Sequence, residues 1–449
     1  MTLAYRTEEN DPLVLAIGQG TAVCDGANLN VDARDEMFRF LLDSHAGERG
    51  QALSIYFHSG QLIWTTQKEI VEWRFGKVGR VGKLLDFASG YGRITRFLVR
   101  DLPPERVWVA DIDADGVRFQ EEQFGVHGIV STAAPEDFAC AERFDCILVS
   151  SLFSHLPEPT FLAWLAKICG LLAPGGMLVF SVHDEALLSD RRAMPASGIV
   201  FSEESESHSL AKSEYGSTWV SEAFVRSAVS RSAPGCSTAR IPRGFCNFQD
   251  LYVVVEGTDP DFSGLTVSAK PEGFVYHCSW VPPDRLEIRG WVIDRVHGKV
   301  REVQALVEGR VLQRISDLTP REDFSREVRN EPVTAWGWHF SIPLPPDLPR
   351  SSGILVVQVV DGAGRESTLY SATIAGALLR SAQLDLVATT AGLQRMRGEK
   401  ELLAWNLRDA RHEAHVLEAR IAAMEASFFW KVRNRWFALK RFLRLTDQP

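Results

Sequence analysis

Short apolar runs alternate with helix-like segments between residues 52 and 258, and this alternation restricts the fold more than any other feature of the chain. The runs are KLLDFA (83–88), RVWVADI (106–112), FDCILVSS (144–151) and GMLVFSVH (176–183). The segments between them, such as TFLAWLAKICGLL, have the apolar spacing of helices. Strands that alternate with helices predict a doubly wound α/β domain, in which helices cover both faces of a parallel sheet.

The two ends of this region carry other patterns. GFCNFQDLYVVVE (244–256) has no helix-like segment after it, and we expect it to form a closing pair of strands. Near the N-terminus, NVDARDEMFRFLLDS (30–44) predicts a helix with Asp32 as its N-cap and Asp35 in its first turn.

The character of the chain changes near residue 258, where GTDPDFSG is rich in turn-forming residues. The runs RLEIRGWVI (285–293), WGWHFSIPL (336–344) and ILVVQVV (354–360) follow, separated by Gly and Pro turns. Short strands with little helix between them predict an all-β sandwich. We therefore divide the chain into an N-terminal extension (1–50), an α/β domain (51–258), a β-sandwich (262–376) and a helical segment (377–449).

Two patterns make up the helical segment. Apolar or small residues recur in steps of four and three at positions 403, 407, 410, 414, 417, 421, 424 and 428, which predicts a short coiled coil. The segment SFFWKVRNRWFALKRFLRL then carries six basic and no acidic residues, together with several aromatic ones. It predicts a basic amphipathic helix.

Composition narrows the class of protein. The formal net charge is −9, so no excess of basic residues exists to neutralise phosphates, and a nucleic-acid partner is not expected. The seven cysteines form no CxxC pair, which is typical of a reducing compartment. The N-terminal residues lack the pattern of a secretory signal, and no apolar run reaches about 18 residues. These features predict a cytoplasmic protein.

The stretch LLDFASGYGRITRF (84–97) passes from an apolar run through two glycines into a helix-like segment. Such a corner points backbone N–H groups at a polar ligand above the sheet edge. Asp86 lies inside the apolar run, where a purely structural strand favours an aliphatic residue. Asp111 ends the next strand, 19 residues after Gly92, a spacing that suits an acid bound to a ribose diol.

This combination resembles the class I S-adenosylmethionine-dependent methyltransferases, which have a Rossmann-like fold. LLDFASGYGR stands where that family has its hydrophobic-Asp-x-Gly/Ala-x-Gly-x-Gly motif, and VWVADID fits its second-strand motif. FDCILVSSLFSHL and LLAPGGMLVFSV are similar to its fourth- and fifth-strand motifs. Upstream, YFHSG (56–60) resembles the Tyr-x-x-Ser-Gly segment of some glycan and lipid methyltransferases.

The resemblance implies S-adenosylmethionine as cofactor and a role for each matching residue. The residues assigned to the methionine part of the cofactor are Tyr56, Ser59, Gly60, Asp86, Ser89, Gly90 and Gly92. Asp111 would hold the ribose hydroxyls, and Ile112 would pack on the adenine. Ser150 and Ser151 would lie at the sheet edge beneath the sulfonium. The chain departs from the family at Ala88, where the first Gly usually stands.

A nicotinamide-dependent dehydrogenase is the competing hypothesis within this fold. Its fingerprint needs a third Gly so that the helix can pack close to the strand, and here Thr95 occupies that position. The Pro-Gly-Gly turn at 174–176 is also foreign to such enzymes. The sequence therefore favours methyl transfer over hydride transfer.

Two histidines are candidates for the catalytic base. If the acceptor is a sugar hydroxyl, a side chain near the carboxyl edge of the sheet must take its proton. His155 follows the fourth strand and His183 ends the fifth, and we favour His183. The alternative for His155 is a hydrogen-bonded loop residue. No cluster of His and carboxylates predicts a metal site.

The C-terminal half carries its own resemblance. The β-rich region is similar to small domains appended to bacterial glycosyltransferases and glycan methyltransferases, and the tail to that of enzymes that build O-antigen and other surface polysaccharides. The resemblance implies O-methylation of a sugar or lipid-linked glycan. The basic helix then suits the inner leaflet of the membrane, and docking on a partner or on its own oligomer is the alternative. The coiled coil suits a homo-oligomer or a glycan-assembly enzyme.

The alternative hypothesis is a degenerate methyltransferase that serves as a scaffold for glycan-assembly enzymes. A scaffold does not need a cofactor site. Asp86, Gly90, Gly92 and Asp111 are all intact, and they favour a working enzyme.

Overall fold

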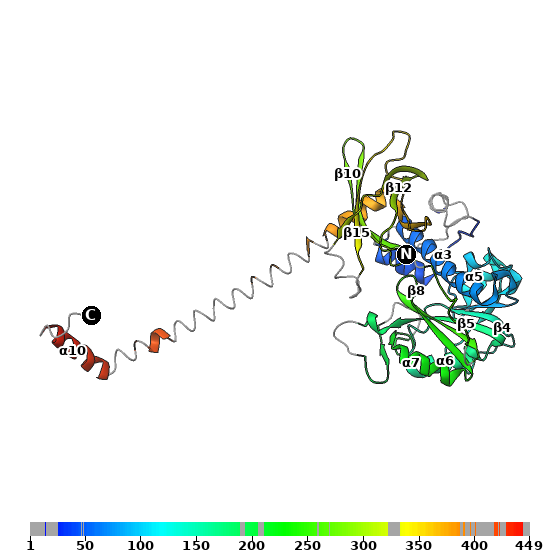
Figure 1. Ribbon diagram of the computed structural model, residues 1–449, viewed down its shortest axis with the longest axis horizontal. Coiled ribbons are helices and arrows are strands. Elements are labelled where there is room, and N and C mark those ends of the chain that lie inside the picture. The colour runs from blue at the N-terminus through cyan, green and yellow to red at the C-terminus, as the bar shows by residue number, and fades with distance from the viewer. Residues whose placement is uncertain are drawn as a thin grey trace. The chain divides into compact units, whose positions relative to one another are not determined.

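The computed structural model places most of the chain. It describes residues 14, 26–45, 47, 49–188, 194–204, 211–257, 260–268, 270–321, 333–386, 389–390, 396, 400, 417–420, 422 and 428–442. The chain forms two compact units, Met1–Ser381 and Ala382–Pro449 (Figure 1).

The larger unit contains a nine-stranded mixed sheet in which seven strands follow the order β3-β2-β1-β4-β5-β7-β6, while β9 pairs with β5 and β8 with β9. Its strands are β1 (Leu84–Phe87), β2 (Val107–Asp111), β3 (His127–Val130), β4 (Phe144–Val149), β5 (Leu172–Asp184), β6 (Ile199–Ser202), β7 (Ser217–Val220), β8 (Cys236–Phe245) and β9 (Gln249–Glu256). The strand order reverses between β1 and β4, so a crevice for a ligand is expected at their carboxyl ends. The predicted doubly wound α/β fold is confirmed, and so is the closing strand pair, which is β8 and β9.

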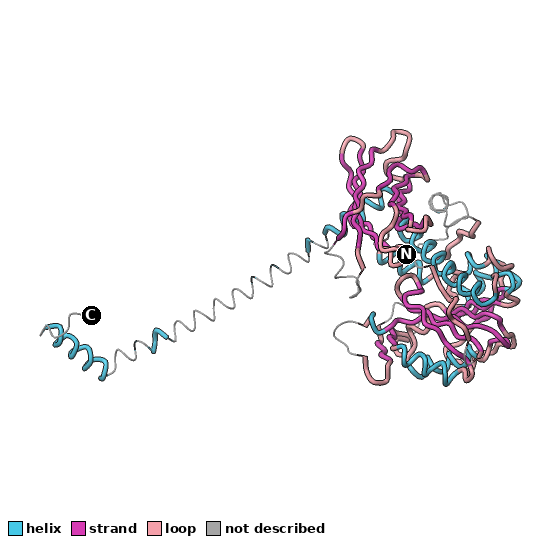
Figure 2. The backbone as a smooth tube through the Cα atoms, in the orientation of Figure 1, coloured by secondary structure: helices cyan, strands magenta, loops and turns pink. Residues whose placement is uncertain are grey.

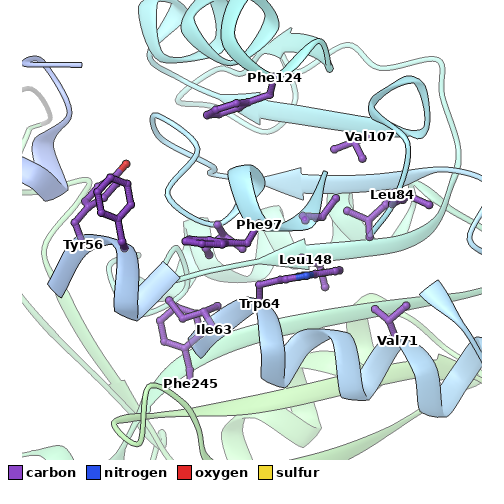
Figure 3. Close-up of a cluster of buried hydrophobic side chains, with 14 of the residues drawn as sticks. Tyr56, Ile63, Trp64, Val71, Leu84, Phe97, Val107, Phe124, Leu148 and Phe245 are labelled. Carbon is purple, nitrogen blue, oxygen red and sulfur yellow. The ribbon is translucent and has the colours of Figure 1, made fainter. Parts of the chain in front are cut away.

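Helices cover both faces of this sheet (Figure 2). They are α2 (Glu36–Ser44), α3 (Arg49–Phe75), α4 (Thr95–Leu98), α5 (Ala114–Phe124), α6 (Glu158–Cys169) and α7 (Glu222–Ser232), with 3-10 turns at Val78–Arg80, Pro104–Arg106 and Glu185–Leu187. On one face, Trp64 of α3 packs in a buried cluster with Leu84 and Leu148 (Figure 3). On the other, Phe87 and Val149 pack with α6 and α7. This alternation along β1 places Asp86 on the α3 face.

The start of α2 differs from the prediction. Asp35 is the N-cap, because its side chain accepts a hydrogen bond from the Phe38 backbone N–H at 3.1 Å. The assignment of Asp32 to this role is therefore wrong. Asp32 instead accepts hydrogen bonds from the backbone and side chain of Arg34, so its carboxylate is not available to a helix.

The chain after residue 270 forms two antiparallel four-stranded sheets, with orders β10-β11-β15-β14 and β13-β12-β16-β17. Their strands are β10 (Glu272–Val281), β11 (Arg285–Ile293), β12 (Glu302–Val307), β13 (Arg310–Ile315), β14 (Thr319–Arg321), β15 (Ala335–Pro343), β16 (Ile354–Val360) and β17 (Glu366–Thr373). Inward residues of both sheets, such as Ile288 and Val357, share one buried cluster.

The second of these sheets also packs on α3. Strand β17 contacts that helix, and the hydroxyls of Ser54 and Ser371 form a hydrogen bond between them. Leu306, Ile354 and Val356 belong to the same buried cluster as the α3 face of the nine-stranded sheet. The β-rich region therefore supports the helix that borders the crevice.

This packing predicts a stability effect that crosses the boundary between the two regions. Ile354 is 1% exposed, and an Ile354→Ala substitution is expected to cost about 3 kcal/mol of folding free energy. Amide hydrogen exchange should then become faster in α3 as well as in β16. Faster exchange in β16 alone would contradict shared packing.

The smaller unit contains α10 (Phe428–Phe442). Trp436, Phe437 and Leu439 of this helix are exposed. Within the part of the chain that the structure describes, no helix is both long enough and apolar enough to cross a membrane. Most of the predicted heptad positions between 403 and 424 lie outside the described residues, so the coiled coil stays a prediction.

Candidate active site

The turn after β1 is held in a conformation that glycine favours. Ala88, Gly90 and Gly92 have φ values of 59°, 56° and 73°. The backbone N–H of Ala88 donates to the carbonyl of Ala110 at 2.7 Å, which fixes the turn to β2. A Cβ added to Gly90 would meet nothing within 4 Å. The turn therefore faces open space at the position expected for a ligand, even though Ala replaces the first glycine.

Asp111, at the end of β2, is tied directly to this turn. Its Oδ2 accepts a hydrogen bond from the Gly90 N–H at 2.7 Å, and its Oδ1 accepts one from the Asp113 N–H at 2.9 Å. Burial raises the pKa of Asp111. Ile112, the next residue, is 41% exposed. The structure thus brings Asp111 to the glycine turn and leaves Ile112 partly exposed beside it in the chain.

The hydrogen bonds around Asp86 indicate which of the groups there carries a proton. Thr95 Oγ1 lies 2.8 Å from both Asp86 Oδ2 and Gln120 Oε1, and a hydroxyl has only one proton to donate. Gln120 Nε2 donates to Ser89 Oγ and to the Gly90 carbonyl, so its Oε1 must accept from Thr95. Every contact is satisfied when Asp86 is protonated and donates to Thr95. Burial raises the pKa of Asp86 to about 7, in agreement with this count.

The pKa of Asp86 predicts pH-dependent binding of S-adenosylmethionine, the cofactor that the sequence implies. Its sulfonium and ammonium are cations, which favour the ionised carboxylate and lower its pKa on binding. Affinity should therefore rise with pH up to about 7 and level off above it, with about half a proton released at pH 7. Calorimetry in buffers of different ionisation enthalpy measures this release. Asp86→Asn should abolish it, and Asp145→Asn, at the opposite end of the sheet, should not.

The residues of the YFHSG segment lie on α3 against the turn. Tyr56 has no exposed surface, and its hydroxyl donates to Asp35 Oδ2 at 2.5 Å. A Cβ on Gly60 would lie 2.2 Å from the Arg93 carbonyl, so only glycine allows this approach. Ser59 Oγ accepts from Arg93 Nη1 at 3.3 Å. In this structure the YFHSG segment positions the glycine turn, and Tyr56 is buried beneath the protein surface.

Arg96 is a buried residue of the site that the sequence did not single out. It is 0% exposed and donates to the carbonyls of Gly92, Asn28 and Asn30 at 3.1, 2.9 and 2.8 Å. Its guanidinium also lies over the Tyr56 ring. Arg96 therefore holds the N-terminal segment and the glycine turn together.

Two glutamines hold the serines after β4. Gln67 Nε2 of α3 donates to Ser150 Oγ at 3.1 Å, and Gln249 Nε2 of β9 donates to Ser151 Oγ at 2.8 Å. Ser151 has a φ of 63°, and its N–H donates to Ser181 Oγ. Neither glutamine was a candidate from sequence, because each lies far along the chain from the strand that it contacts.

His155 and His183 lie close together, with ring centroids 6.1 Å apart. His155 Nδ1 lies 2.7 Å from the Gly216 carbonyl, so Nδ1 carries the proton and Nε2 keeps its lone pair. Burial lowers the pKa of His155, which keeps the ring neutral. Its ring stacks on Tyr215 at 4.6 Å. His183 Nε2 lies 3.4 Å from the Gln249 amide nitrogen, which occupies that side of its ring.

Among the residues that the structure describes, no group of three or more His, Cys, Asp or Glu side chains is arranged to hold a metal ion. The polar segment FSEESESHSLAKSEYGSTWV (201–220) lies partly outside the described residues, at 205–210. Its described ends form β6 and β7, which pair with each other.

Comparison with known proteins finds one family match. Residues 85–178, which include most of β1 and all of β2 and β4, match the model of a family described as a methyltransferase domain. The match covers the glycine turn, Asp111 and both serines after β4. This part of the chain is therefore similar to a methyltransferase domain, which supports a class I S-adenosylmethionine-dependent methyltransferase.

Several solved methyltransferases are similar in structure at low sequence identity. The DhpI–SAH complex has a TM-score of 0.33 and 16% identity, and the match covers 50% of this chain and 98% of that one. An O-methyltransferase family protein from Burkholderia thailandensis has a TM-score of 0.34 and 16% identity. The match covers 49% of this chain and 63% of that one. CalS10, an amino pentose methyltransferase from Micromonospora echinaspora, has a TM-score of 0.32 and 14% identity. The match covers 43% of this chain and 91% of that one. A search of curated proteins finds no significant match.

Proposed function

We propose that the protein transfers a methyl group from S-adenosylmethionine to a sugar hydroxyl during the synthesis of bacterial surface polysaccharide. The observation that carries the chemistry is the pair His155 and His183 at the carboxyl ends of β4 and β5. Trp219 and Phe248 lie against His183 with ring centroids 6.1 and 5.6 Å away. Aromatic faces beside this pair of histidines suit the apolar face of a sugar ring. The polysaccharide context rests on the resemblance of the C-terminal half.

The residues of the site fit the cofactor. Asp86 Oδ1 is a buried acceptor without a partner among the described residues, and the space above Gly90 is open. The residues that would hold the cofactor are Tyr56, Ser59, Gly60, Asp86, Ser89, Gly90, Gly92, Asp111, Ile112, Ser150 and Ser151, with Tyr56 and Gly60 acting through the residues that they position. When bound, S-adenosylmethionine supplies an activated methyl group.

His155 is proposed as the general base. Its Nδ1–H is engaged by the Gly216 carbonyl, so Nε2 is the nitrogen that takes the proton of the acceptor hydroxyl. The lowered pKa keeps this nitrogen unprotonated at neutral pH. His183, which the sequence analysis favoured, becomes the second candidate. The hydrogen-bond geometry therefore favours His155 over His183.

The activity is tested by methyl transfer from radiolabelled S-adenosylmethionine to a panel of nucleotide sugars and lipid-linked oligosaccharides. Label in a sugar methyl ether is the expected product. Label in protein or in a nitrogen-linked methyl group would contradict sugar O-methylation, even though methyl transfer itself would stand.

We further propose that each part of the chain has its own task. Residues 51–258 carry out catalysis, residues 262–376 support the catalytic domain, and residues 377–449 attach the protein to a membrane. Helix α10 carries Arg433, Arg435, Lys440 and Arg441 beside exposed Trp436. A basic helix with aromatic residues suits an anionic membrane surface. The full chain should sediment with vesicles that contain phosphatidylglycerol and not with pure phosphatidylcholine. Equal sedimentation with both, or with neither, would contradict an anionic membrane partner.

A further inference from the structure

The turn between β8 and β9 lies at the carboxyl end of β5. The antiparallel register pairs Val182 with Asp250, so the next step along the two strands brings His183 beside Gln249. His183 also pairs with Trp219 of β7. His183, the second candidate for the base, is therefore a neighbour of both strands. The start of β9 thus borders the place where the acceptor is proposed to bind.

The side chain of Gln249 is only 5% exposed, and one atom of its amide group has no partner. Its Nε2 donates to Ser151 Oγ at 2.8 Å and lies 3.4 Å from His183 Nε2. Its Oε1 is buried and has no hydrogen-bond partner among the residues that the structure describes. Turning the amide over would exchange the two atoms and leave a buried N–H group unpaired instead. A polar group of a ligand is therefore expected beside this side chain.

The backbone near this turn is held in a conformation that its side chains disfavour. Arg243 and Cys246 have φ values of 53° and 54°, in the left-handed region that residues other than Gly, Asn and Asp rarely adopt. The Arg243 N–H donates to Asp250 Oδ1 at 2.8 Å, and Cys246 Sγ donates to the Ser59 carbonyl at 3.9 Å. Strain of this kind persists where surrounding contacts fix it, and it is concentrated at ligand sites.

Phe248, the last residue of the turn, is a large apolar side chain that is 44% exposed. Its ring centroid lies 5.6 Å from that of His183, with an angle of 78° between the ring planes. Sites for small molecules combine aromatic side chains with a few well-placed polar groups. Phe248 and Gln249 offer this combination, because both lie beside His183.

We propose that Phe248 and Gln249 form a specificity subsite for an acceptor sugar that carries a second hydroxyl near the one that is methylated. The amide oxygen of Gln249 accepts a hydrogen bond from this second hydroxyl, and Phe248 covers an apolar face of the same sugar ring. This inference rests on the proposed sugar O-methylation and deepens it, because it restricts which sugars are accepted. Both residues lie outside the 85–178 family match.

The test uses the sugar that takes up label in the methyl-transfer assay and its deoxy forms, each of which lacks one of the hydroxyls that are not methylated. With the unmodified protein, one deoxy form should have a kcat/KM about 10-fold lower than that of the parent sugar, because it leaves the Gln249 oxygen unpaired. With Gln249→Met, the parent sugar should lose about 10-fold as well. That deoxy form should lose nothing further, since both partners of the hydrogen bond are then gone.

Three further variants separate recognition of the hydroxyl from an effect on folding. Gln249→Glu keeps an oxygen for the hydroxyl and should keep the preference for the parent sugar over that deoxy form. Phe248→Ala should lower kcat/KM for all of these sugars by the same factor, because contact with the ring does not depend on one hydroxyl. Gln304, on β12, is also a buried glutamine, 2% exposed, and Gln304→Met should leave every kcat/KM unchanged.

The outcomes distinguish failure of the inference from failure of the proposed function. If Gln249→Met lowers kcat/KM by one common factor for the parent sugar and every deoxy form, or leaves all of them unchanged, Gln249 binds no hydroxyl and the inference is wrong, while sugar O-methylation stands. If Phe248→Ala changes none of them, the subsite as proposed is wrong. If no sugar takes up label, the proposed function fails, and the inference fails with it.

Discussion

An Arg96→Met substitution is expected to lower the free energy of unfolding by about 4 kcal/mol, because it leaves several buried carbonyls without a donor. The carbonyls of Asn28, Asn30 and Gly92 all accept from this one guanidinium. Tyr56 also loses the cation above its ring. The methionine can fill much of the volume, so the loss reports hydrogen bonding and charge more than a cavity.

Urea denaturation measures this loss. Arg100→Met is the matched control, since Arg100 is exposed one turn further along the chain, and a change within about 0.5 kcal/mol is expected there. A loss below about 1 kcal/mol for Arg96→Met would show that the N-terminal segment is held to the glycine turn by other contacts.

A His155→Gln substitution is expected to lower kcat by about 10²- to 10⁴-fold, the usual contribution of a general base. Glutamine can keep the hydrogen bond to the Gly216 carbonyl but has no lone pair that takes a proton at neutral pH. The affinity for S-adenosylmethionine should stay the same, because the proposed role of His155 is to contact the acceptor and not the cofactor. Steady-state kinetics with the acceptor found in the methyl-transfer assay measure kcat, and calorimetry measures the affinity.

His183→Gln serves as the comparison for this substitution. Its ring nitrogen already faces the Gln249 amide, so a decrease in kcat of less than about 10-fold is expected. If His183→Gln causes the larger loss, His183 is the base, as the sequence first suggested. If neither substitution lowers kcat by more than a few-fold, the acceptor needs no histidine base.

The parts of the site that sequence could predict are local. The strands that carry Asp86 and Asp111, and the strand just before Ser150, are short apolar runs, and the glycine turn follows one of them directly. Because parallel strands present their carboxyl ends at one edge, finding the strands was enough to bring these residues together.

The parts that sequence could not predict depend on contacts between distant segments. Arg96 and Arg93 look alike in the helix-like segment. Only the fold shows that Arg96 is buried, between the N-terminal segment and the rings of Tyr56, Phe57 and Phe124. Gln67 and Gln249 are ordinary polar residues until α3 and β9 place them beside β4. Asp32 and Asp35 are both plausible N-caps, and the choice was decided by Arg34 and by the Tyr56 hydroxyl.

The β-rich region illustrates a further limit of predicting packing from sequence. Its strands alternate in the usual way and predict a core of their own, which they have. However, Leu306 and Ile354 also join the cluster beneath α3. Apolar residues of a strand do not indicate whether they pack within their own domain or against a neighbour, so the support of α3 by this region was visible only in the structure.

Calorimetric titration of the full chain with S-adenosylmethionine tests the central claim most directly, with NADH and an Asp111→Ala variant as controls. The account predicts binding in the micromolar range that the Asp111→Ala variant loses, since Asp111 is the carboxylate at the glycine turn, and no binding of NADH. A folded protein that gives no heat with S-adenosylmethionine would contradict the account and favour a scaffold without a working cofactor site.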